Sequence, residues 1–294
     1  MINPEVKLIA IVGPTASGKT EMSLKLAEKY NGEIVCADSR TIYRGMDIGT
    51  AKPTAEEQAR APHHLIDIIN PDQSLSAGEF KRLAEAAIND IWARGRVPFL
   101  VGGSGLYVDA VIYEYDFPAT ADLELRQKLD ALSDDELRAR LKERDPEFYA
   151  EVDTKNRRRL VRAIEVAGQP RSKRADVRPN TLVIAPNTDK EIIKERIKLR
   201  VAKMVDNGFV AEVRAMGEKY GLGCEGFGVI GYKAFKDVVF GQKPLEEGMA
   251  DFAKGDTLLL KKQLTWFKRN QSIHWLGGFE EADALVGDFL EKSQ

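Results

Sequence analysis

The segment GPTASGKT at residues 13–20 constrains the fold more than any other part of the chain. It fits the pattern G-x-x-x-x-G-K-[ST], in which backbone N–H groups and a lysine surround the phosphates of a ligand. The apolar run VKLIAIV at 6–12 precedes it, and a segment with helical periodicity at Met22, Leu26 and Ala27 follows it. A strand, a glycine-rich loop and a helix in this order predict an α/β sheet with a phosphate site at its carboxyl edge.

Further short apolar runs alternate with helical segments along the chain. Each run is apolar nearly throughout, as expected for strands that are buried on both faces. A capping box at Ser76 and Glu79 begins a helix with one apolar stripe, and Gly95 ends it. We therefore expect a mostly parallel β-sheet flanked by helices. The candidate strands are 6–12, 33–37, 64–68, 97–101 and 181–185.

The alternation stops between Phe117 and Asp153, where the sequence is charged, helical and without strand-like runs. Ser133 and Glu136 form a second capping box within this stretch. An all-helical stretch between two strands of a parallel sheet indicates an insertion over the carboxyl edge. We expect the first part of the core at 1–116, the inserted helical domain at 117–152 (its far end anywhere from 150 to 180), and a return to the core with C-terminal helices at 153–294.

Composition indicates an ordinary globular protein, with 43% hydrophobic and 31% charged residues. The apolar runs are far too short to span a bilayer, and the first residues lack the pattern of an export signal. Cys36 and Cys224 offer neither a disulfide framework nor metal-ligand spacing. We expect a cytoplasmic monomer without a membrane partner.

The net charge of −2 does not by itself indicate a nucleic-acid partner, but basic residues are concentrated in two places. From Lys155 to Arg178 there are nine basic residues and two acidic ones. The segment KKQLTWFKR at 261–269 is also basic and contains Trp266 and Phe267. A solvated helix face is the alternative for any basic run. Aromatic residues among the charges favour a polyanion surface, because bases stack on flat apolar side chains.

The phosphate loop predicts the roles of its own residues. Backbone N–H groups around Ala16 to Gly18 would point at phosphate oxygens, and Lys19 would bridge phosphates. The Thr20 hydroxyl would be placed to ligate Mg²⁺. This pattern predicts a polyphosphate ligand without identifying it. The candidate phosphate-binding residues are Gly13, Thr15, Ala16, Ser17, Gly18, Lys19 and Thr20.

Two other strand ends carry polar residues at the same edge. Asp38 follows the second strand, where its carboxylate could bind Mg²⁺ through water or accept a proton from a nucleophile. The alternative is that Asp38 only caps a turn with Ser39. The fourth strand ends in GGSGLY at 102–107, whose glycines would let the backbone approach a ligand closely. Ser104 would face the same edge as Lys19 and Asp38, where it is a candidate to contact the leaving phosphate; the alternative is a simple strand-to-helix turn.

In their order along the chain these segments resemble the tRNA dimethylallyltransferase family, also called tRNA isopentenyltransferases. The resemblance extends from about residue 8 to about residue 275, and ordered co-occurrence makes it specific. It rests on GPTASGKT, ADSRTIYRGMDIGTAKP, HHLID, SAGEF, GGSGLY, NRRRLVRAIEVAGQP, VIGYKAF and KKQLTWFKRN. With the alternating strands, it implies a P-loop NTPase-like α/β core, a mostly parallel sheet flanked by helices, with an inserted all-helical domain.

The resemblance implies that the loop holds the diphosphate of dimethylallyl diphosphate, not ATP, with Mg²⁺ as cofactor. It implies that the acceptor is the N6 amine of the adenine just 3′ of the anticodon, in tRNAs reading codons that begin with U. Asp38, Lys19 and Ser104 would be the catalytic residues, with Asp38 taking the amine proton. The implied contacts with the anticodon stem-loop are Asp38, Ser39, Arg40, Thr41, Ser104, Arg126, Arg159, Arg162, Gln263 and Trp266.

The sequence departs from the family's usual wording at several positions. Thr41 stands where a Gln is usual, and Ser104 replaces a Thr while keeping its hydroxyl. Gly228 occupies a position where some members carry an Arg or Gln near the diphosphate, and AKGDTLLLKKQLTWF lacks the usual Arg-Tyr-Ala wording. The departures at Thr41 and Gly228 affect the expected tRNA choice and phosphate contacts, not the reaction.

Two other functions remain as alternatives. A small P-loop kinase would share the sheet, the loop and an inserted lid with arginines. An RNA-binding protein with a decayed phosphate site is a weaker alternative, because Lys19, Thr20 and Asp38 are all intact. The DSRTIY stretch and the basic, Trp-containing segment favour the transferase, since a metabolite kinase has no need for either.

Overall fold

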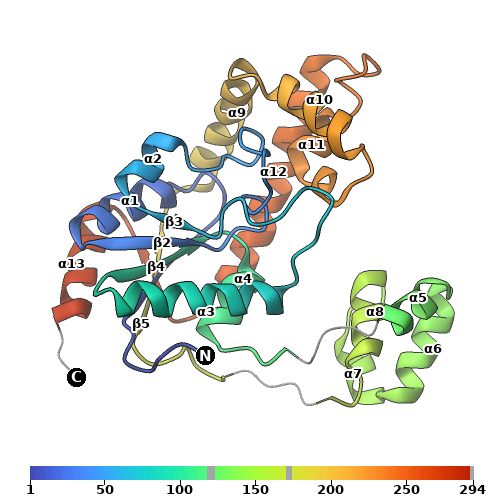
Figure 1. The fold of residues 1–294 in the computed structure, drawn as a ribbon, viewed down its shortest axis with the longest axis horizontal. Helices are drawn as coiled ribbons and strands as arrows, with labels where there is room; N and C mark the ends of the chain where they lie inside the picture. The colour runs from blue at the N-terminus through green and yellow to red at the C-terminus, as the bar shows by residue number, and fades with distance from the viewer. Residues whose placement is uncertain (118–122, 170–173, 292–294) are drawn as a thin grey trace. The chain divides into compact units, whose positions relative to one another are not determined.

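The computed structural model describes residues 1–117, 123–169 and 174–291. It divides the chain into two compact units. Unit 1 comprises Met1–Glu114 and Ala175–Gln294 and contains the sheet, and unit 2 comprises Tyr115–Arg174. Figure 1 shows the strands of unit 1 and the helices of unit 2.

Unit 1 is built on a six-stranded sheet in the order β3-β2-β4-β1-β5-β6, in which every neighbouring pair is parallel. The predicted fold class is thus confirmed, and four predicted strands are found where the sequence indicates them. All residues of β1 are buried, as expected for a central strand that helices cover on both faces. The strands are β1 (Leu8–Val12), β2 (Gly32–Cys36), β3 (His63–His64), β4 (Val97–Gly102), β5 (Thr181–Pro186) and β6 (Ile273–Leu276).

Two strands differ from the sequence-based expectation. The run predicted at 64–68 is wrong in extent, because β3 ends at His64. Leu65 (φ 63°) and Asp67 (φ 55°) adopt left-handed backbone conformations, which end the extended run. The edge strand β6 lies in a stretch interpreted as helical; its four residues include exposed and half-buried side chains, so they form no continuous apolar run.

Helices cover both faces of the sheet and give it two hydrophobic cores. On one face lie α1 (Lys19–Lys29) and α13 (Phe279–Glu291), and on the other lie α3 (Ala77–Ala93) and α4 (Gly105–Ile112). The predicted capping box begins α3, since the Glu79 N–H donates to the Ser76 hydroxyl (3.2 Å) and the Ser76 N–H to the Glu79 carboxylate (2.9 Å). The short helix α2 (Ala55–Arg60) precedes β3.

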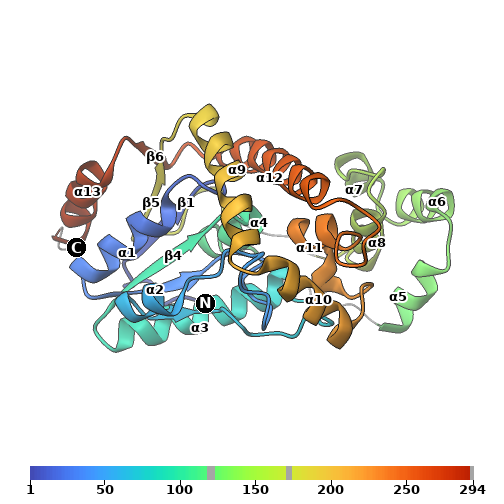
Figure 2. The ribbon, with the colours of Figure 1, turned by 90° about the horizontal axis from the view of Figure 1, so that it is seen from above.

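A second helical group completes unit 1. Its core is rich in aromatic side chains, with Phe209, Tyr232, Phe235 and Phe252 all fully buried. Helices α9 and α12 pack against each other, and Figure 2 shows them side by side. The elements are α9 (Lys190–Asp206), α10 (Phe209–Tyr220), the 3₁₀ helix η1 (Glu225–Gly228), α11 (Ile230–Phe235) and α12 (Leu245–Phe267).

Unit 2 is a small helical unit around its own leucine-rich core. It contains α5 (Leu123–Asp130), α6 (Asp134–Arg144), α7 (Pro146–Glu151) and α8 (Arg157–Glu165). The predicted capping box of Ser133 and Glu136 begins α6. Because α8 packs against α5 and α6, unit 2 extends to Arg174, past residue 152 but within the interval 150–180 expected for its far end.

The chain leaves unit 1 for unit 2 and returns to it at neighbouring points. The backbone N–H of Arg178, soon after the return, donates to the carbonyl oxygen of Ile112 at the end of α4 (2.8 Å). None of the helices in the described part of the chain combines the length and the apolar character that crossing a bilayer requires.

Candidate active site

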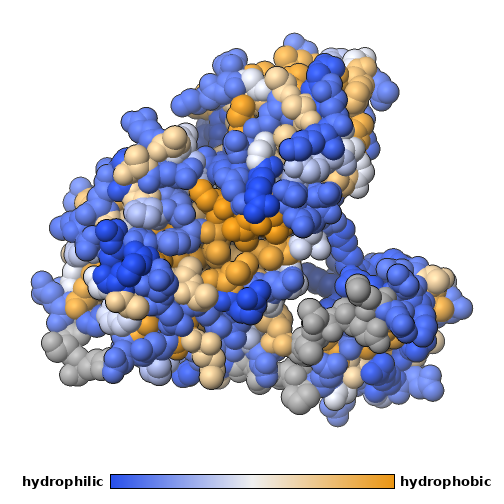
Figure 3. Space-filling model, in the orientation of Figure 1, coloured by the Kyte–Doolittle hydropathy of each residue, from blue (hydrophilic) through white to orange (hydrophobic). Residues whose placement is uncertain are grey.

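A cavity of about 1240 Å³ lies in unit 1 where β1, β2 and β4 end. Residues from three segments line it: 15–20 after β1 (all but Ser17), 38–41 after β2, and 102–107 at the end of β4 and beyond. Residues of α9 and α12 also line it. On the face shown in Figure 3, the surface of unit 1 is mostly hydrophilic, with hydrophobic side chains gathered in a central hollow. A concave site with apolar walls and convergent polar groups is typical of small-molecule binding. The structure therefore brings together the three strand ends that the sequence indicated.

The phosphate loop has the backbone shape that its sequence predicts. Ala16 (φ 61°) and Gly18 (φ 95°) are left-handed, and Gly18 is the N-cap of α1. This curls the loop over the helix N-terminus, where N–H groups and the helix dipole favour an anion. The candidate residues that line the cavity are Thr15, Ala16, Gly18, Lys19 and Thr20; Gly13 and Ser17 do not line it and lie buried in the loop's base.

Lys19 is the cation of this loop. Its Nζ donates to the carbonyl oxygen of Pro14 (3.1 Å). The pKa of Lys19 is lowered to about 8, mainly because the amine is buried. The nearby Asp38 carboxylate raises this pKa, and the charges of Arg200 and Arg40 lower it. An anionic ligand would favour the protonated amine, so Lys19 suits a site that is filled by a diphosphate.

Thr20 lines the cavity beside Lys19, and Asp38 lines it from the second strand end. Within the described ranges, no group of three His, Cys, Asp or Glu side chains could hold a metal ion. Mg²⁺ often takes only one or two protein oxygens and completes its shell with phosphates and water. One hydroxyl and one carboxylate therefore fit a Mg²⁺ ion that enters with a diphosphate.

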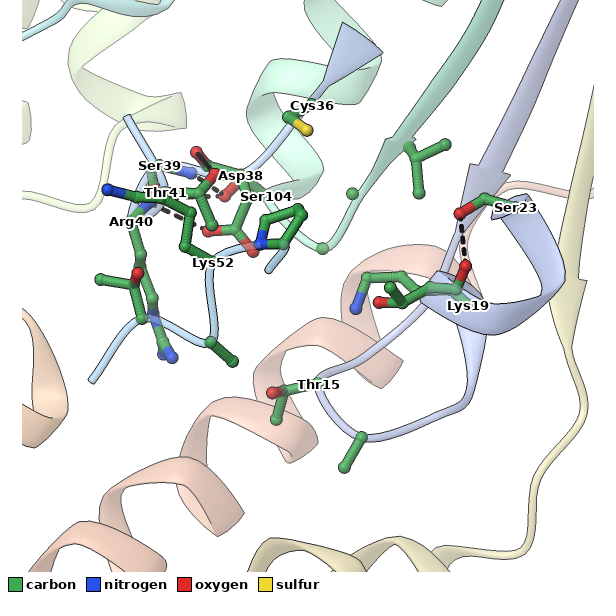
Figure 4. A pocket seen from close by; sticks show the side chains of 18 of the residues that line it. Thr15, Lys19, Ser23, Cys36, Asp38, Ser39, Arg40, Thr41, Lys52 and Ser104 are labelled. Carbon is green, nitrogen blue, oxygen red and sulfur yellow. Dashed lines mark hydrogen bonds between the residues drawn. The ribbon is translucent and has the colours of Figure 1, made fainter. Parts of the chain in front are cut away.

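Ser39 and Ser104 are hydrogen-bonded to each other, and Asp38 precedes Ser39 in the chain. The Arg40 N–H donates to Asp38 Oδ1 (2.9 Å), so Asp38 caps a turn, as the alternative interpretation supposed. Among the residues that the structure describes, nothing donates to its other oxygen, Oδ2. The Ser39 N–H donates to the Ser104 hydroxyl (2.9 Å), which in turn lies 3.1 Å from the Ser39 hydroxyl. Figure 4 shows Asp38, Ser39 and Ser104 on one side of the cavity and Lys19 with Thr15 on the other.

The glycines of the loop after β4 serve close packing within the protein itself. A Cβ atom at Gly102 would lie 2.0 Å from the carbonyl oxygen of Ala37. At Gly103 it would lie 2.6 Å from Gln263 Nε2, and at Gly105 2.4 Å from the Trp266 ring. These three glycines also line the cavity, so the expected close approach of their backbone to a ligand stays a prediction.

Gln263 connects the phosphate loop with the loop after β4. The Thr15 N–H donates to its Oε1 (3.0 Å), and its Nε2 donates to the carbonyl oxygen of Gly103 (2.9 Å). Trp266, on the next turn of α12, donates its indole N–H to Asp109 Oδ2 (2.8 Å). Both side chains line the cavity, as the sequence-based site requires, although their polar atoms already have partners in the protein.

The family model described as IPP transferase matches residues 41–270 of this chain. The chain belongs to the IPP transferase family. The tRNA dimethylallyltransferase 1 of Citrifermentans bemidjiense is 42% identical to it, over 97% of this chain and 98% of that protein. The tRNA dimethylallyltransferase of Staphylococcus aureus is 40% identical, over 92% of each chain. These matches confirm the resemblance that the sequence motifs indicated.

Solved structures of the family agree with the fold. The tRNA isopentenylpyrophosphate transferase of Bacillus halodurans superposes with a TM-score of 0.75 at 37% identity, covering 98% of this chain and 97% of that one. A eukaryotic dimethylallyltransferase described as acting on tRNA has a TM-score of 0.87 at 22% identity, covering 97% and 80%. That second likeness shows the shared fold alone.

Two positions that depart from the family's usual sequence, Thr41 and Gly228, differ in their relation to the cavity. Thr41 is buried, and its hydroxyl lies 3.5 Å from the carbonyl oxygen of Asp38. Arg40 lines the cavity and forms an ion pair with Asp256 (3.2 Å). Gly228 ends η1 and is not among the described residues that line the cavity. Thr41 therefore belongs to the site and Gly228 does not.

Sequence reasoning missed the cations that α9 contributes to the cavity, Arg196, Arg200 and Lys203. Arg196 and Arg200 are four residues apart, so they share one face of the helix. The periodicity of α9 alone indicates a helix with a solvated basic face. Nothing in the local sequence shows that this face lines a cavity. Lys52, also missed, is buried and pairs with Asp47 and Asp67.

Arg126, expected in the insertion, and Arg159 and Arg162, expected after it, all lie in unit 2. Arg126 and Arg162 each pair with the buried carboxylate of Glu165, at 3.3 and 3.1 Å. Arg159 is the most exposed of the three, with 63% of its side chain accessible and Asp153 at 3.5 Å.

Other parts of the two basic segments are structural. Arg178 is only 3% exposed and donates to the carbonyl oxygens of Val6 (3.2 Å) and Asn3 (3.1 Å), so placing it on a polyanion surface was wrong. Phe267 is buried in the core under the sheet and cannot stack on a base. Arg171 and Lys173 lie outside the described residues.

Proposed function

We propose that this protein transfers the dimethylallyl group of dimethylallyl diphosphate to the N6 amine of the adenine 3′-adjacent to the anticodon, releasing diphosphate. The acceptors are tRNAs reading codons that begin with U. The observation that carries the proposal is one cavity in which the phosphate loop with Lys19 faces Asp38 and its available Oδ2. The protein acts as a monomer in the cytoplasm.

On the donor side, the allylic C–O bond breaks and its electron pair goes to the departing diphosphate oxygen. The N–H groups around Ala16 to Gly18 and the Lys19 ammonium would stabilise that charge and so lower the barrier, and the cavity lining by Ala16, Gly18 and Lys19 supports this role. Mg²⁺, when bound, neutralises part of the same charge. Thr20 would hold it, and its position beside Lys19 supports that role.

On the acceptor side, N6 forms the new bond to the allylic carbon and loses a proton, which Asp38 Oδ2 accepts. The Arg40 N–H on Oδ1 orients the carboxylate, and the Ser39–Ser104 hydrogen bonds hold the neighbouring turn. An adenine in the anticodon loop must leave its stack to reach this cavity, at a cost of roughly a few kcal/mol. The apolar cavity wall and its rim would offset that cost.

The tRNA anticodon stem-loop would contact both units. Near the adenine, contacts would come from the cavity residues Ser39, Arg40, Thr41, Gln263 and Trp266. In unit 2, Arg126, Arg159 and Arg162 would contact phosphates, and the exposure of Arg159 suits it best for that role.

The test offers the purified protein unmodified tRNA and Mg²⁺, with labelled dimethylallyl diphosphate or γ-labelled ATP in parallel. Prenyl label appearing in tRNA supports the proposal, whereas phosphate from ATP reaching a small acceptor supports the kinase. Asp38→Asn keeps an acceptor for the Arg40 N–H but cannot take the proton. It should slow transfer about 100-fold or more while leaving tRNA affinity unchanged. Equal losses of affinity and rate would remove Asp38 from the role of base.

A further inference from the structure

A buried lysine on the wall of the cavity donates hydrogen bonds to three acceptors. Only 3% of the Lys52 side chain is exposed. Its Nζ donates to the carbonyl oxygen of Tyr43 (2.7 Å) and to one carboxylate oxygen each of Asp47 and Asp67. An ammonium group has three N–H donors, so each donor of Lys52 has an acceptor. We call these four residues the Lys52 group; it carries one positive and two negative charges.

The Lys52 group is joined to residues 38–41, which we call the acceptor turn because they carry the proposed base. The backbone N–H of Asp67 donates to the carbonyl oxygen of Thr41, the last residue of this turn (3.2 Å). Tyr43, whose carbonyl oxygen accepts from Lys52, lies only two residues further along the chain. Lys52 therefore holds the end of the acceptor turn from two directions.

A second carboxylate anchors the other side of the Lys52 group. The backbone N–H groups of residues 47–49 all donate to the carboxylate of Glu212 on α10, at 2.8 to 2.9 Å. The hydroxyl of the fully buried Tyr232 donates to the same carboxylate. Successive N–H groups that converge on one anion form a well-defined turn. Asp47 is thus held at its backbone by Glu212 and at its side chain by Lys52.

The Lys52 group faces the cavity and not only the core. Lys52, Asp47 and Asp67 all line the cavity. Figure 4 shows Lys52 on the side of Asp38, across the cavity from Lys19. A buried ion pair adds little net stability compared with apolar side chains of the same volume, whereas in some proteins it specifies one geometry. Here that geometry lies next to the proposed base.

We propose that Lys52 is a positioning residue for prenyl transfer. It holds the acceptor turn, so that Asp38 Oδ2 stays where the adenine amine gives up its proton. The inference rests on the proposed function and concerns a side chain that need not touch the reacting atoms. A displacement of about 1 Å at a catalytic group can slow a reaction on the order of 100-fold. Because none of the three acceptors of Lys52 belongs to the phosphate loop, diphosphate binding should not depend on it.

The experiment measures kcat and the donor KM of prenyl transfer at saturating tRNA, and the Kd of inorganic pyrophosphate by calorimetric titration. Lys52→Met keeps the length of the side chain and removes its three donors. Its kcat should fall about tenfold or more, while the donor KM and the pyrophosphate Kd stay within about twofold of the wild type. A loss of stability alone would not produce this split in a folded variant.

Lys7→Met is the matched control. It also removes a partly buried amine that donates to a backbone carbonyl oxygen, that of Leu290 (2.7 Å), and Lys7 is not among the described residues that line the cavity. All three constants should stay within about twofold of the wild type, as for a change away from the site. A kcat for Lys52→Met that matches this control overturns the proposal.

A double variant separates position from charge. Lys52→Met leaves the group with two negative charges, and adding Asp47→Asn restores the original net charge without restoring the donors of Lys52. The double variant should transfer as slowly as Lys52→Met, and recovery to the wild-type rate overturns the positioning role. It also removes the repulsion between the two carboxylates, so it replaces Lys52→Met in the test if the single variant does not fold.

The outcomes for the inference and for the proposed function are distinct. A wild-type protein that binds pyrophosphate but transfers no prenyl group refutes the proposed function, and the role of Lys52 with it. A wild-type protein that transfers the prenyl group no faster than the two Lys52 variants refutes only the inference.

Discussion

Replacing Gln263 with Glu would separate the two loops that form the donor side of the cavity. The side chain is 9% exposed, and its amide connects the Thr15 N–H with the Gly103 carbonyl oxygen. In Gln263→Glu one carboxylate oxygen still accepts from Thr15, but the other meets the Gly103 oxygen with no proton between them. Leaving that carbonyl without its donor costs about 1–3 kcal/mol.

For a unit of this size each kcal/mol corresponds to about 2–4 °C, so the melting temperature should fall by on the order of 5 °C. The pyrophosphate Kd should rise as well, because the Thr15 N–H and the Gly103 loop are no longer held in register. Scanning calorimetry and titration calorimetry measure the two effects. Gln271→Glu makes the same chemical change at an exposed position and should shift the melting temperature little. If Gln263→Glu melts and binds pyrophosphate like that control, the connection between the loops is not what shapes the site.

Three further changes test other parts of the structure. Because burial holds the pKa of Lys19 at about 8 and a bound diphosphate favours the protonated amine, pyrophosphate affinity should fall as the pH rises through 8. Lys19→Arg, which stays charged, should flatten that fall in calorimetric titrations. Gly102→Ala places a methyl group 2.0 Å from the Ala37 carbonyl oxygen and should cost about 3 kcal/mol or more in urea unfolding, whereas Gly223→Ala, which meets nothing within 4 Å, should cost little. Arg159→Ala should reduce the salt dependence of tRNA binding by about one unit in the log–log slope, measured by filter binding, and an unchanged slope would remove Arg159 from the RNA surface.

The features that the sequence predicts correctly are local ones. β1, β2 and β4 are short runs that helices bury on both faces, so their composition alone identifies them. The capping boxes at Ser76 and Ser133 depend on two residues three positions apart, and both are present. The phosphate loop is equally local, because its turn, its glycines and the following helix lie in one short segment.

The features that sequence reasoning missed depend on contacts between distant segments. Arg200 faces the cavity only because α9 packs against α12, which brings it to Asp256. The sequence around Trp266 does not reveal that its indole N–H donates to Asp109, which lies 157 residues away in the chain. β6 is an edge strand that pairs with β5, and its own four residues form no continuous apolar run that would predict a strand. Such partners follow from tertiary packing, and no periodicity within one segment reveals them.

The hydrogen bond between Arg178 and Ile112 has a consequence for how the family can change. It joins the segment that leaves unit 1 to the segment that returns to it, so both ends of the insertion start from neighbouring points of unit 1. A short linker between those points would span almost no distance, and the entropy of closing a loop grows only slowly with its length. Unit 2 could therefore be replaced by the inserted helical unit of another family member. We expect such a chimera to keep the cavity of unit 1 intact.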